Sequence, residues 1–377
     1  MPKVVVFFGP DKEFSGLLTK RISKDEDTVE FLSVIRKYNA QVRASDLPVS
    51  EVELSNKASV DNCIVRSDDF GSVLSHAVSN FASIIAQSYE AANIFVQNPP
   101  TKAYESLRAF YPEDIETIYT QYQRMDKSAL KTSYELLKQK IVGQDDCLLK
   151  LISSLYKLSC FGEEKPAVVL LYGPSGVGKT ETAKCLSEAL GGALTRTQFS
   201  MMQTNESADY LFGAEHSKNS FARDLLKRES NVVLLDEFDK VNSLFYNAFY
   251  QLFDEGIFVD TNYTVNMAGS IFLCTSNFAT EHEAMRALGP AMFSRIDSCI
   301  EYGELPDFAK IKILSSHYES ILSRIDDEDA KAIGATRIYD WFEDNVERYS
   351  NVRLMKAKLE NAIFDELANR LINNQVN

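Results

Sequence analysis

The feature that most constrains this chain of 377 residues is a glycine-rich loop at residues 173–180, which reads Gly-Pro-Ser-Gly-Val-Gly-Lys-Thr. The loop follows a continuous apolar run at residues 168–172, which is typical of a strand buried on both faces of a parallel sheet. Residues 181–190 then have helical spacing and end at Gly191-Gly192. A strand, a loop of the form G-x-x-x-x-G-K-[ST] and a helix, in this order, predict an α/β fold that binds nucleotide phosphates.

The residue types of this loop suit a polyphosphate. Glycines allow backbone N–H groups to turn inward around the phosphates, and the start of the following helix adds partial positive charge. We expect Lys179 to contact the β- and γ-phosphates of ATP and Thr180 to bind Mg²⁺. The expected nucleotide contacts in this segment are Gly173, Pro174, Ser175, Gly176, Val177, Gly178, Lys179, Thr180 and Glu181.

A pair of acidic residues follows a second apolar run. Residues 232–235 read Val-Val-Leu-Leu and are followed by Asp236 and Glu237. Ligands of open α/β sheets bind beyond the carboxyl ends of the strands, so these carboxylates are expected beside the phosphate loop. We expect Asp236 to hold Mg²⁺, directly or through water, and Glu237 to orient and polarise the attacking water.

These motifs and four further segments resemble the Clp family of AAA+ unfoldases. The similarity covers about residues 136–375, and its motifs stand in the order and at the spacing of that family. The last motif is the loosest, because Asn351-Val352-Arg353 stands where the family carries Gly-Ala-Arg. The similar segments are 141–144, 173–184, 232–240, 275–277, 293–297 and 351–353.

The resemblance implies a site residue in each of these segments. Ile141 and Val142 would flank the adenine, and Asn277 would help to place the attacking water as sensor 1. Arg295 would be the arginine finger, and Arg353 would be sensor 2, which responds to the γ-phosphate. Each polar residue also fits a plainer role: Asn277 as a strand end, Arg295 as a solvated surface arginine and Arg353 as a helix start.

The resemblance further implies an ATPase with a parallel-sheet core and a small helical lid. The finger of this family acts on the nucleotide of the neighbouring subunit, so a homo-oligomer, most simply a six-membered ring, is expected. Residues 136–304 would form the large ATPase domain and residues 305–377 the lid. Hydrolysis would then drive the lid to rotate against the core.

The remaining residues resemble no family. Residues 3–8 and 94–96 are apolar runs typical of strands, and residues 70–90 have the spacing of an amphipathic helix. We therefore predict a small α/β domain over residues 1–100 that recognises a client or partner. Gly9 follows a strand, as in a phosphate loop, but no Gly-Lys-Ser/Thr comes after it. Residues 101–135 have a helical pattern and are predicted to be a connector.

Composition limits the partners. The formal net charge is −14, and an acidic chain repels phosphate backbones, so nucleic-acid binding is not expected of the whole surface. Six cysteines without a CxxC pair or nearby histidines favour reduced thiols, and no stretch of 18 apolar residues is present. We expect a soluble cytoplasmic protein with no membrane association.

Two departures from the family leave the function open. The segment 211–221 lacks the aromatic Gly-Tyr-Val-Gly pore loop with which unfoldases grip a chain, although Tyr210, Phe212 or His216 would offer a ring. In this respect the chain is similar to the torsin relatives. The sequence also lacks the tripeptide with which unfoldases dock on a partner peptidase. Three hypotheses remain: a protein-remodelling ATPase, an ATP-gated switch or assembly factor that threads no chain, and an ATPase that acts on DNA.

Overall fold

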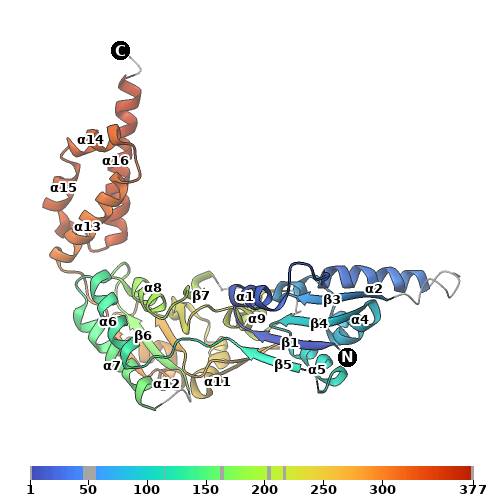
Figure 1. Cartoon of the computed structure of the whole chain (residues 1–377). Helices are drawn as coiled ribbons and strands as arrows, with labels where there is room; N and C mark the ends of the chain where they lie inside the picture. The colour runs from blue at the N-terminus through green and yellow to red at the C-terminus, as the bar shows by residue number, and fades with distance from the viewer. Residues whose placement is uncertain are drawn as a thin grey trace.

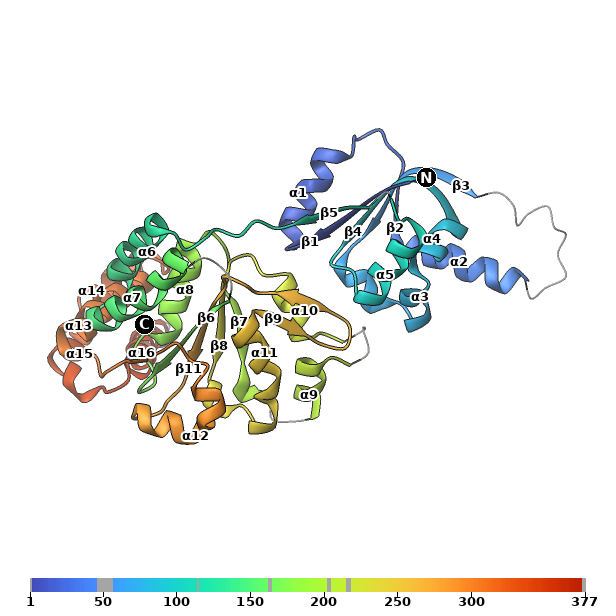
Figure 2. The ribbon, with the colours of Figure 1, turned by 90° about the horizontal axis from the view of Figure 1, so that it is seen from below.

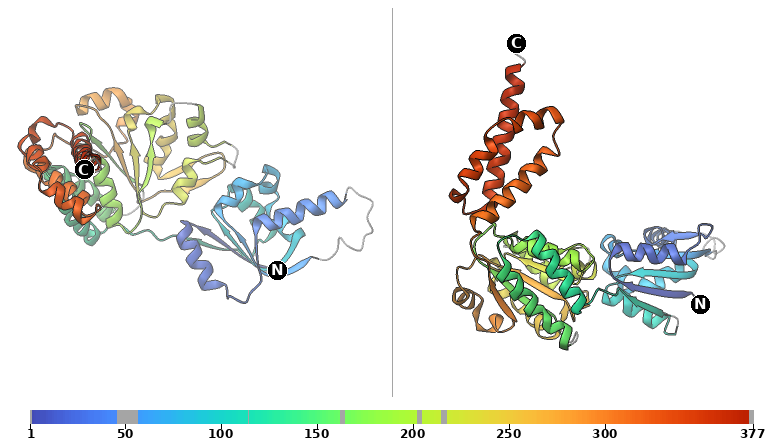
Figure 3. Two further views of the ribbon diagram at one scale, coloured as in Figure 1. Left: turned by 90° about the horizontal axis from the view of Figure 1, so that it is seen from above. Right: turned by 60° about the vertical axis from the view of Figure 1, so that its left-hand side comes forward.

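The computed structural model describes residues 2–45, 57–113, 115–161, 165–201, 205–214 and 218–374. In these residues the chain forms two α/β units, each with a five-stranded sheet, and a group of helices at the C-terminal end. The first unit and the C-terminal helices lie on different sides of the second unit (Figures 1 and 3). This architecture confirms the predicted α/β fold with a parallel sheet, a C-terminal helical lid and an N-terminal α/β domain.

The first unit is built on a fully parallel sheet in the order β2-β3-β4-β1-β5. Helix α1 covers one face, while α2, α4 and α5 cover the other. Its strands are β1 (Lys3–Phe8), β2 (Thr28–Glu30), β3 (Ala58–Val65), β4 (Tyr89–Gln97) and β5 (Ile115–Tyr119). Its helices are α1 (Asp11–Arg21), α2 (Phe31–Ser45), η1 (Ser67–Ser72), α3 (Ser75–Ser79), α4 (Phe81–Ser88) and α5 (Thr101–Phe110).

The second unit holds another fully parallel sheet, in the order β12-β6-β11-β8-β7, and a small antiparallel hairpin of β9 and β10. Its strands are β6 (Ala167–Tyr172), β7 (Thr195–Gln198), β8 (Val232–Asp236), β9 (Ile257–Val259), β10 (Thr264–Asn266), β11 (Ile271–Thr275) and β12 (Ser298–Glu301). Its helices are α6 (Lys127–Lys140), α7 (Asp145–Phe161), α8 (Lys179–Ala189), η2 (Phe199–Met201), α9 (Asn205–Phe212), α10 (Phe221–Leu226), η3 (Phe238–Lys240), η4 (Ser243–Phe245), α11 (Asn247–Glu255) and α12 (Glu281–Phe293).

Strand β6 of the second sheet is buried on both faces. Val169 and Leu171 of β6 pack with α6, α7 and α8, while Val168 and Leu170 pack with α10, α11 and α12. Adjacent side chains of a strand point to opposite faces, so a strand covered on both sides must be apolar throughout. This burial explains why the run before the phosphate loop is continuous rather than alternating.

The lid consists of four helices and one short 3₁₀ turn. Met355, Leu359 and Ile363 of the last helix, α16, are fully buried in the apolar core, and the other three α-helices pack on this helix. The elements are α13 (Asp307–Leu322), α14 (Asp327–Gly334), α15 (Ile338–Asp344), η5 (Val346–Arg348) and α16 (Val352–Asn374). Among the described residues, no helix has both the length and the apolarity needed to cross a bilayer.

Two predictions for the N-terminal half differ from the structure. The single helix expected over residues 70–90 is divided into η1, α3 and α4, because Leu74 is extended and Asn80 ends α3 by donating its side-chain amide to the carbonyl of His76. The segment 101–135 is not helical throughout, since it contains β5, which pairs with β1. The first sheet therefore extends to Tyr119, and residues 120–126 lead to the second unit without regular structure (Figure 2).

Candidate functional site

A cavity of about 830 Å³ lies at the carboxyl ends of the second sheet's strands, between this sheet and the lid. We call it the phosphate-loop pocket. The strands of a parallel sheet point their carboxyl ends to one edge, so the loops after β6, β8 and β11 all reach it. Its lining from the second unit includes Gln139, Lys140, Ile141, Val142, Ser175, Gly176, Val177, Gly178, Lys179, Thr180, Glu181, Lys184, Arg196, Gln198, Asp236, Glu237, Thr275, Ser276 and Asn277. Leu305, Lys312, Ile313, Ser316, Val352, Arg353 and Lys356 complete it.

The phosphate loop folds around the amine of Lys179. The Nζ atom donates to the carbonyl oxygens of Gly173, at 2.6 Å, and Pro174, at 2.7 Å. Burial lowers the pKa of Lys179 to about 8, against the opposing influence of Asp239 and Asp236. A partly desolvated cation held by neutral carbonyls gains from an anionic partner, which a phosphate would supply.

Two glycines of the loop stand where a side chain would collide. Gly173 has a φ of 128°, and a Cβ there would meet the carbonyl oxygen of Tyr302. Gly176 has a φ of 85°, and its Cβ would lie 2.5 Å from the Oδ1 atom of Asn351, which directly precedes α16. The loop is therefore pressed between the sheet and the lid, and glycine is needed at both positions.

Asp236 is buried, with an exposed fraction of 5%, and both of its carboxylate oxygens are engaged. The hydroxyl of Thr275 donates to Oδ1, and the Nε atom of Arg196 donates to Oδ2 at 2.9 Å. The same Thr275 hydroxyl accepts a 3.0 Å hydrogen bond from the backbone N–H of Glu237. One threonine thus ties the end of β11 to both members of the acidic pair.

Glu237 has a left-handed backbone, with a φ of 56° and a ψ of 46°. This conformation costs a non-glycine residue about 1–3 kcal/mol and is concentrated at functional sites. The Nε2 atom of Gln198 lies 3.5 Å from the Oε2 atom of Glu237. The strained turn and the end of β7 together aim this carboxylate into the phosphate-loop pocket.

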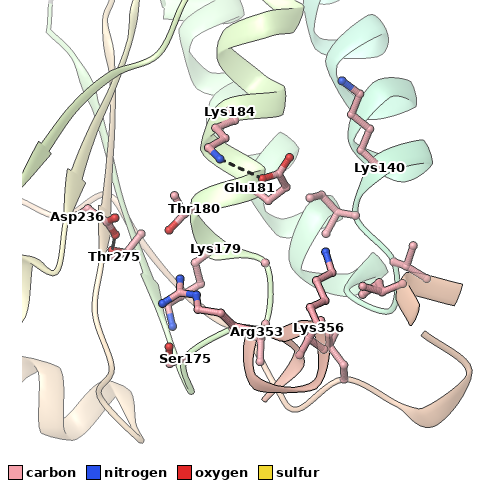
Figure 4. Close-up of a pocket in the computed structure, with 18 of the residues that line it drawn as sticks. Lys140, Ser175, Lys179, Thr180, Glu181, Lys184, Asp236, Thr275, Arg353 and Lys356 are labelled. Atoms are coloured by element: carbon pink, nitrogen blue, oxygen red, sulfur yellow. Dashed lines mark hydrogen bonds and ion pairs between the residues drawn. The ribbon is translucent and has the colours of Figure 1, made fainter. Parts of the chain in front are cut away.

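The lid brings both apolar and cationic groups to the pocket. Ile141 and Val142 of the second unit and Ile313 of α13 are apolar lining residues. Arg353 and Lys356 of α16 are cationic, and Figure 4 shows Arg353 reaching from the lid toward the loop that carries Ser175 and Lys179. The lid side of the pocket can therefore bind an apolar ring and an anion at the same time.

The donor set fits a magnesium ion together with a nucleotide. Mg²⁺ is usually bound through one or two carboxylates and the substrate's phosphates, with water completing the shell. Thr180 and Asp236 line the same pocket and offer a hydroxyl and a carboxylate oxygen. Arg196 holds one oxygen of Asp236, so this arginine would have to yield part of that contact to a cation.

The structure places nearly all of the predicted site residues at this pocket. Asn277, which follows β11, and Arg353 on the lid both line it, as do the expected phosphate-loop residues from Ser175 to Glu181. Gly173 and Pro174 contribute through their carbonyls to Lys179 rather than as lining residues.

Arg295 also does not line the pocket of its own chain, and its side chain contacts residues of α11 and α12 instead. Its Nε atom donates to Asp254 at 2.9 Å, its Nη1 atom donates to the carbonyl of Ala291, and its guanidinium lies 4.3 Å from the ring centre of Tyr250. A residue that serves a neighbouring subunit would lie away from its own nucleotide site.

Several lining residues were missed from the sequence. Gln198 and Thr275 stand at strand ends, which is a signal that could have found them. Arg196 lies inside a strand, so only the pairing of β7 with β8 brings it to Asp236. The lid cations Lys312 and Lys356 have no local motif, and they reach the pocket through the packing of the lid.

A known protein family matches the part of the chain that forms most of this pocket. Residues 164–372, more than half of the chain, match the model of the AAA domain (Cdc48 subfamily). The chain belongs to the AAA domain family. Its similarity to Clp proteins confirms the predicted Clp-type AAA+ relationship, and an AAA domain implies nucleotide binding.

Among the relatives is the chaperone protein ClpB of Malacoplasma penetrans (strain HF-2), which is 26% identical over 278 residues, or 62% of this chain and 39% of that protein. The AAA+ ATPase ClpV1 of Pseudomonas aeruginosa is 31% identical over 186 residues, covering 45% of this chain and 20% of that protein. The mitochondrial disaggregase of Rattus norvegicus is 28% identical over 266 residues, covering 61% and 39%. The matched part of this AAA protein thus spans about a fifth to two fifths of these relatives.

Solved structures of Hsp104 share the fold. The S. cerevisiae Hsp104-ADP complex superposes with a TM-score of 0.53 and 20% identity over 66% of this chain and 41% of that chain. The closed state of Hsp104 with ATPγS and FITC casein gives a TM-score of 0.53 and 15% identity over 99% of this chain and 89% of that chain. At these identities the likeness concerns the fold alone, and it extends over both α/β units.

Proposed function

We propose that this AAA protein hydrolyses ATP in the phosphate-loop pocket and uses the energy to remodel proteins. The observation that carries the proposal is the joint placement of Lys179, the pair Asp236 and Glu237, Asn277 and the lid's Arg353 around one cavity. Its similarity to ClpB and to a mitochondrial disaggregase supports protein as the substrate class.

The residues of the pocket have distinct roles in this proposal. Lys179 exchanges its two loop carbonyls for the β- and γ-phosphates and stabilises charge that develops on the γ-phosphoryl oxygens. Thr180 and Asp236 hold Mg²⁺, which would neutralise phosphate charge when bound. Glu237 accepts a proton from the attacking water, and Asn277 donates a hydrogen bond that orients this water.

The proposed partners follow from Arg295 and the lid. Arg295 would leave Asp254 and act on the nucleotide of a neighbouring copy, which requires a homo-oligomer and most simply a six-membered ring. A trans-acting arginine is worth about 10³–10⁵ in rate in P-loop enzymes. Arg353 would contact the γ-phosphate and convert its loss into movement of the lid, while the first unit would receive the client or effector.

The experiment that tests the proposal compares the wild type with Glu237→Gln. Glutamine keeps the size of the side chain but does not accept the water's proton, so ATP binding should persist while hydrolysis falls to background. Binding is measured with a fluorescent ATP analogue and hydrolysis by phosphate release. Glu105→Gln, at an exposed position of α5 in the first unit, is the matched control and should hydrolyse ATP normally. Full activity of Glu237→Gln would contradict the proposal.

An ATP-gated switch that threads no chain is the second candidate. It is favoured by the contact of the first unit with loops of the second: the backbone N–H of Thr101 donates to the carbonyl of Asn262 at 2.7 Å, and Asn262 in turn contacts Ala214. Ala214 belongs to the segment 211–221, which corresponds to the pore loop of the unfoldases. His216, one of the three candidate rings, lies outside the described residues. Within the second unit, Tyr210 donates to Asp224, and Phe212 packs against Phe245.

Unfolded polypeptide distinguishes the two candidates. A remodelling motor should hydrolyse ATP faster when an unfolded protein such as casein is added, whereas a switch should keep its rate. A third candidate, an ATPase that acts on DNA, has only the fold family in its favour, and the net charge of −14 opposes it. Binding of DNA that weakens with added salt would revive that candidate.

A further inference from the structure

The two sheets share their register as well as their strand order. Val6 of β1 pairs with Val96 of β4, and Leu170 of β6 pairs with Cys274 of β11. Val6 and Leu170 each stand three residues before a Gly-Pro pair. The next backbone contact is also the same, since Asn98 donates to the carbonyl of Phe7 at 2.8 Å and Ser276 donates to that of Leu171 at 3.0 Å. The first unit is therefore a second copy of the strand arrangement that carries the phosphate loop.

At the carboxyl edge of the first sheet, side-chain hydrogen bonds occupy the place that the phosphate loop has in the second sheet. Helix α1 begins at Asp11, two residues after Gly9, whereas α8 begins six residues after Gly173. Asn98 bonds to the N–H and the carbonyl of Gly9, and the side chain of Gln97 donates to this carbonyl and to Asp11. The backbone N–H of Gly9, a donor that a phosphate would need, is thus already bonded to Asn98.

The charges at this edge are exchanged relative to the second sheet. Arg66 follows Val65, which pairs with Val96, and Asp236 follows Leu235, which pairs with Cys274. Because Val96 and Cys274 are equivalent in the two sheets, Arg66 stands at the position of Asp236. Glu30 pairs with Ile64, and Arg196 pairs with Leu234, each two residues before Arg66 or Asp236. Glu30 therefore stands at the position of Arg196. A guanidinium in place of a carboxylate does not bind Mg²⁺, so this edge is not suited to a magnesium-bound nucleotide.

Cations of α10 and the turn after it occupy the edge instead. The Nη2 atom of Arg223 lies 3.0 Å from Oδ1 of Asp68 and 3.4 Å from the carbonyl oxygen of Ser67. The Nζ atom of Lys227 lies 2.7 Å from the same Asp68 oxygen and 3.6 Å from Asp11. The side chain of Arg223 is 7% exposed, so its charge depends on Asp68 and the two carbonyl oxygens it reaches.

Further contacts surround these ion pairs. The hydroxyl of Tyr122 donates to the carbonyl of Arg228 at 3.1 Å, and the guanidinium of Arg228 lies 4.1 Å from the ring centre of Tyr122. Phe8, at the end of β1, packs against the apolar cluster of the second unit. Tyr122, in the segment that links the two units, is thus held against the turn after α10, beside the ion pairs.

We propose that the carboxyl edge of the first sheet has become a docking surface for α10 of the same chain, with Asp68 as the carboxylate that Arg223 and Lys227 share, and that this docking sets the activity of the second unit. The path to the nucleotide site is short. Residues 227–231 alone separate α10 from β8, whose last residue is Asp236. A shift of α10 on undocking would therefore pass through only these residues to the strand that presents the acidic pair.

The test of docking is cleavage by chymotrypsin at Tyr122, which the docked units protect. Asp68→Lys places a cation against Arg223 and Lys227 and should raise the cleavage rate by about tenfold, because it leaves Arg223 buried without its anion. Adding Lys227→Asp to this variant restores an opposite pair and should recover part of the protection. Circular dichroism should show that both variants keep their helices and strands.

Glu105→Lys is the matched control, since it makes the same change of charge at an exposed position of α5. Equal cleavage of Asp68→Lys and Glu105→Lys would overturn the docking proposal. Failure of Lys227→Asp to recover any protection would also overturn it, because Asp68→Lys would then act by damaging the first unit.

A second readout tests the link to activity, and this arm alone rests on the proposed function. Asp68→Lys should hydrolyse ATP several-fold more slowly than Glu105→Lys, and addition of Lys227→Asp should recover part of the rate. An unchanged rate in a variant that is cleaved quickly would overturn the link but not the docking. A wild-type protein without hydrolysis would overturn the proposed function and leave the cleavage result standing.

Discussion

The two α/β units have the same strand order but opposite contents at the carboxyl edge of the sheet. In the second unit this edge surrounds a cavity of about 830 Å³, lined by the phosphate loop and the acidic pair. In the first unit, Gln97 and Asn98 bond to Gly9, and Asp68 binds cations of α10 and of the turn after it. The strand order therefore fixes where a ligand can bind, while a few residues at the strand ends decide whether it does.

Among the substitutions that test this difference between the two units, Lys179→Ala should have the largest effect on the rate of ATP hydrolysis. It removes the cation that the loop carbonyls of Gly173 and Pro174 hold, and the rate of ATP hydrolysis should fall by about 10³-fold. Lys12→Ala, in the first turn of α1 at the corresponding edge, should leave the rate unchanged. Titration with ATP should give one nucleotide per wild-type chain, and a second nucleotide that survives Lys179→Ala would break the contrast.

Thr275→Val should have the next largest effect. Valine keeps the shape but loses the hydroxyl that joins Asp236 to the backbone of Glu237, and the rate should fall by about tenfold to a hundredfold. Steady-state kinetics should show the loss mainly in kcat, because the acidic pair acts on the reacting groups. A change confined to KM would mean that Thr275 serves nucleotide binding instead.

Arg353→Ala should have a smaller effect, about tenfold on the rate, since it removes one charged contact from the lid side of the pocket. Lys358→Ala, on the same helix but not among the residues that line the pocket, is the control. The comparison is made at saturating ATP by phosphate release. Equal rates for the two variants would remove Arg353 from the proposed site.

Gln97→Leu should change stability without changing catalysis. The side chain of Gln97 is 1% exposed, accepts from the buried N–H of Ser67 and donates to the carbonyl of Gly9 and to Asp11. Leucine would leave the N–H of Ser67 unpaired and cost about 1–3 kcal/mol. Urea unfolding of the first unit measures the loss. A similar loss of ATPase rate in the folded variant would show that this edge takes part in the chemistry.

Local sequence patterns predicted which residues would gather at this pocket, because strand, loop and helix are contiguous there. The apolar runs of β6 and β8 signalled buried strands, and the residues that follow them in the chain meet at one edge. The likeness of the two units was not visible from such patterns. It depends on register, which puts Arg66 and Glu30 at the places of Asp236 and Arg196, and register arises from pairing between distant strands.

The errors have similar causes. Strand β5 is an edge strand whose side chains are half-buried or exposed, so it lacks the apolar run that identified the central strands. The break between α3 and α4 depends on the side chain of Asn80, which competes for the backbone of His76. The lid cations Lys312 and Lys356 come to the pocket only when the lid packs, and their neighbours in the sequence give no sign of it.

The most direct test of a shared active site is the rate of ATP hydrolysis per chain over a wide range of protein concentration, for the wild type and for Arg295→Ala. We predict a rate that rises steeply with concentration in the wild type and collapses in the variant, because Arg295 lies outside its own pocket and would complete that of a neighbour. A rate that is independent of concentration and equal in both proteins would contradict a shared active site.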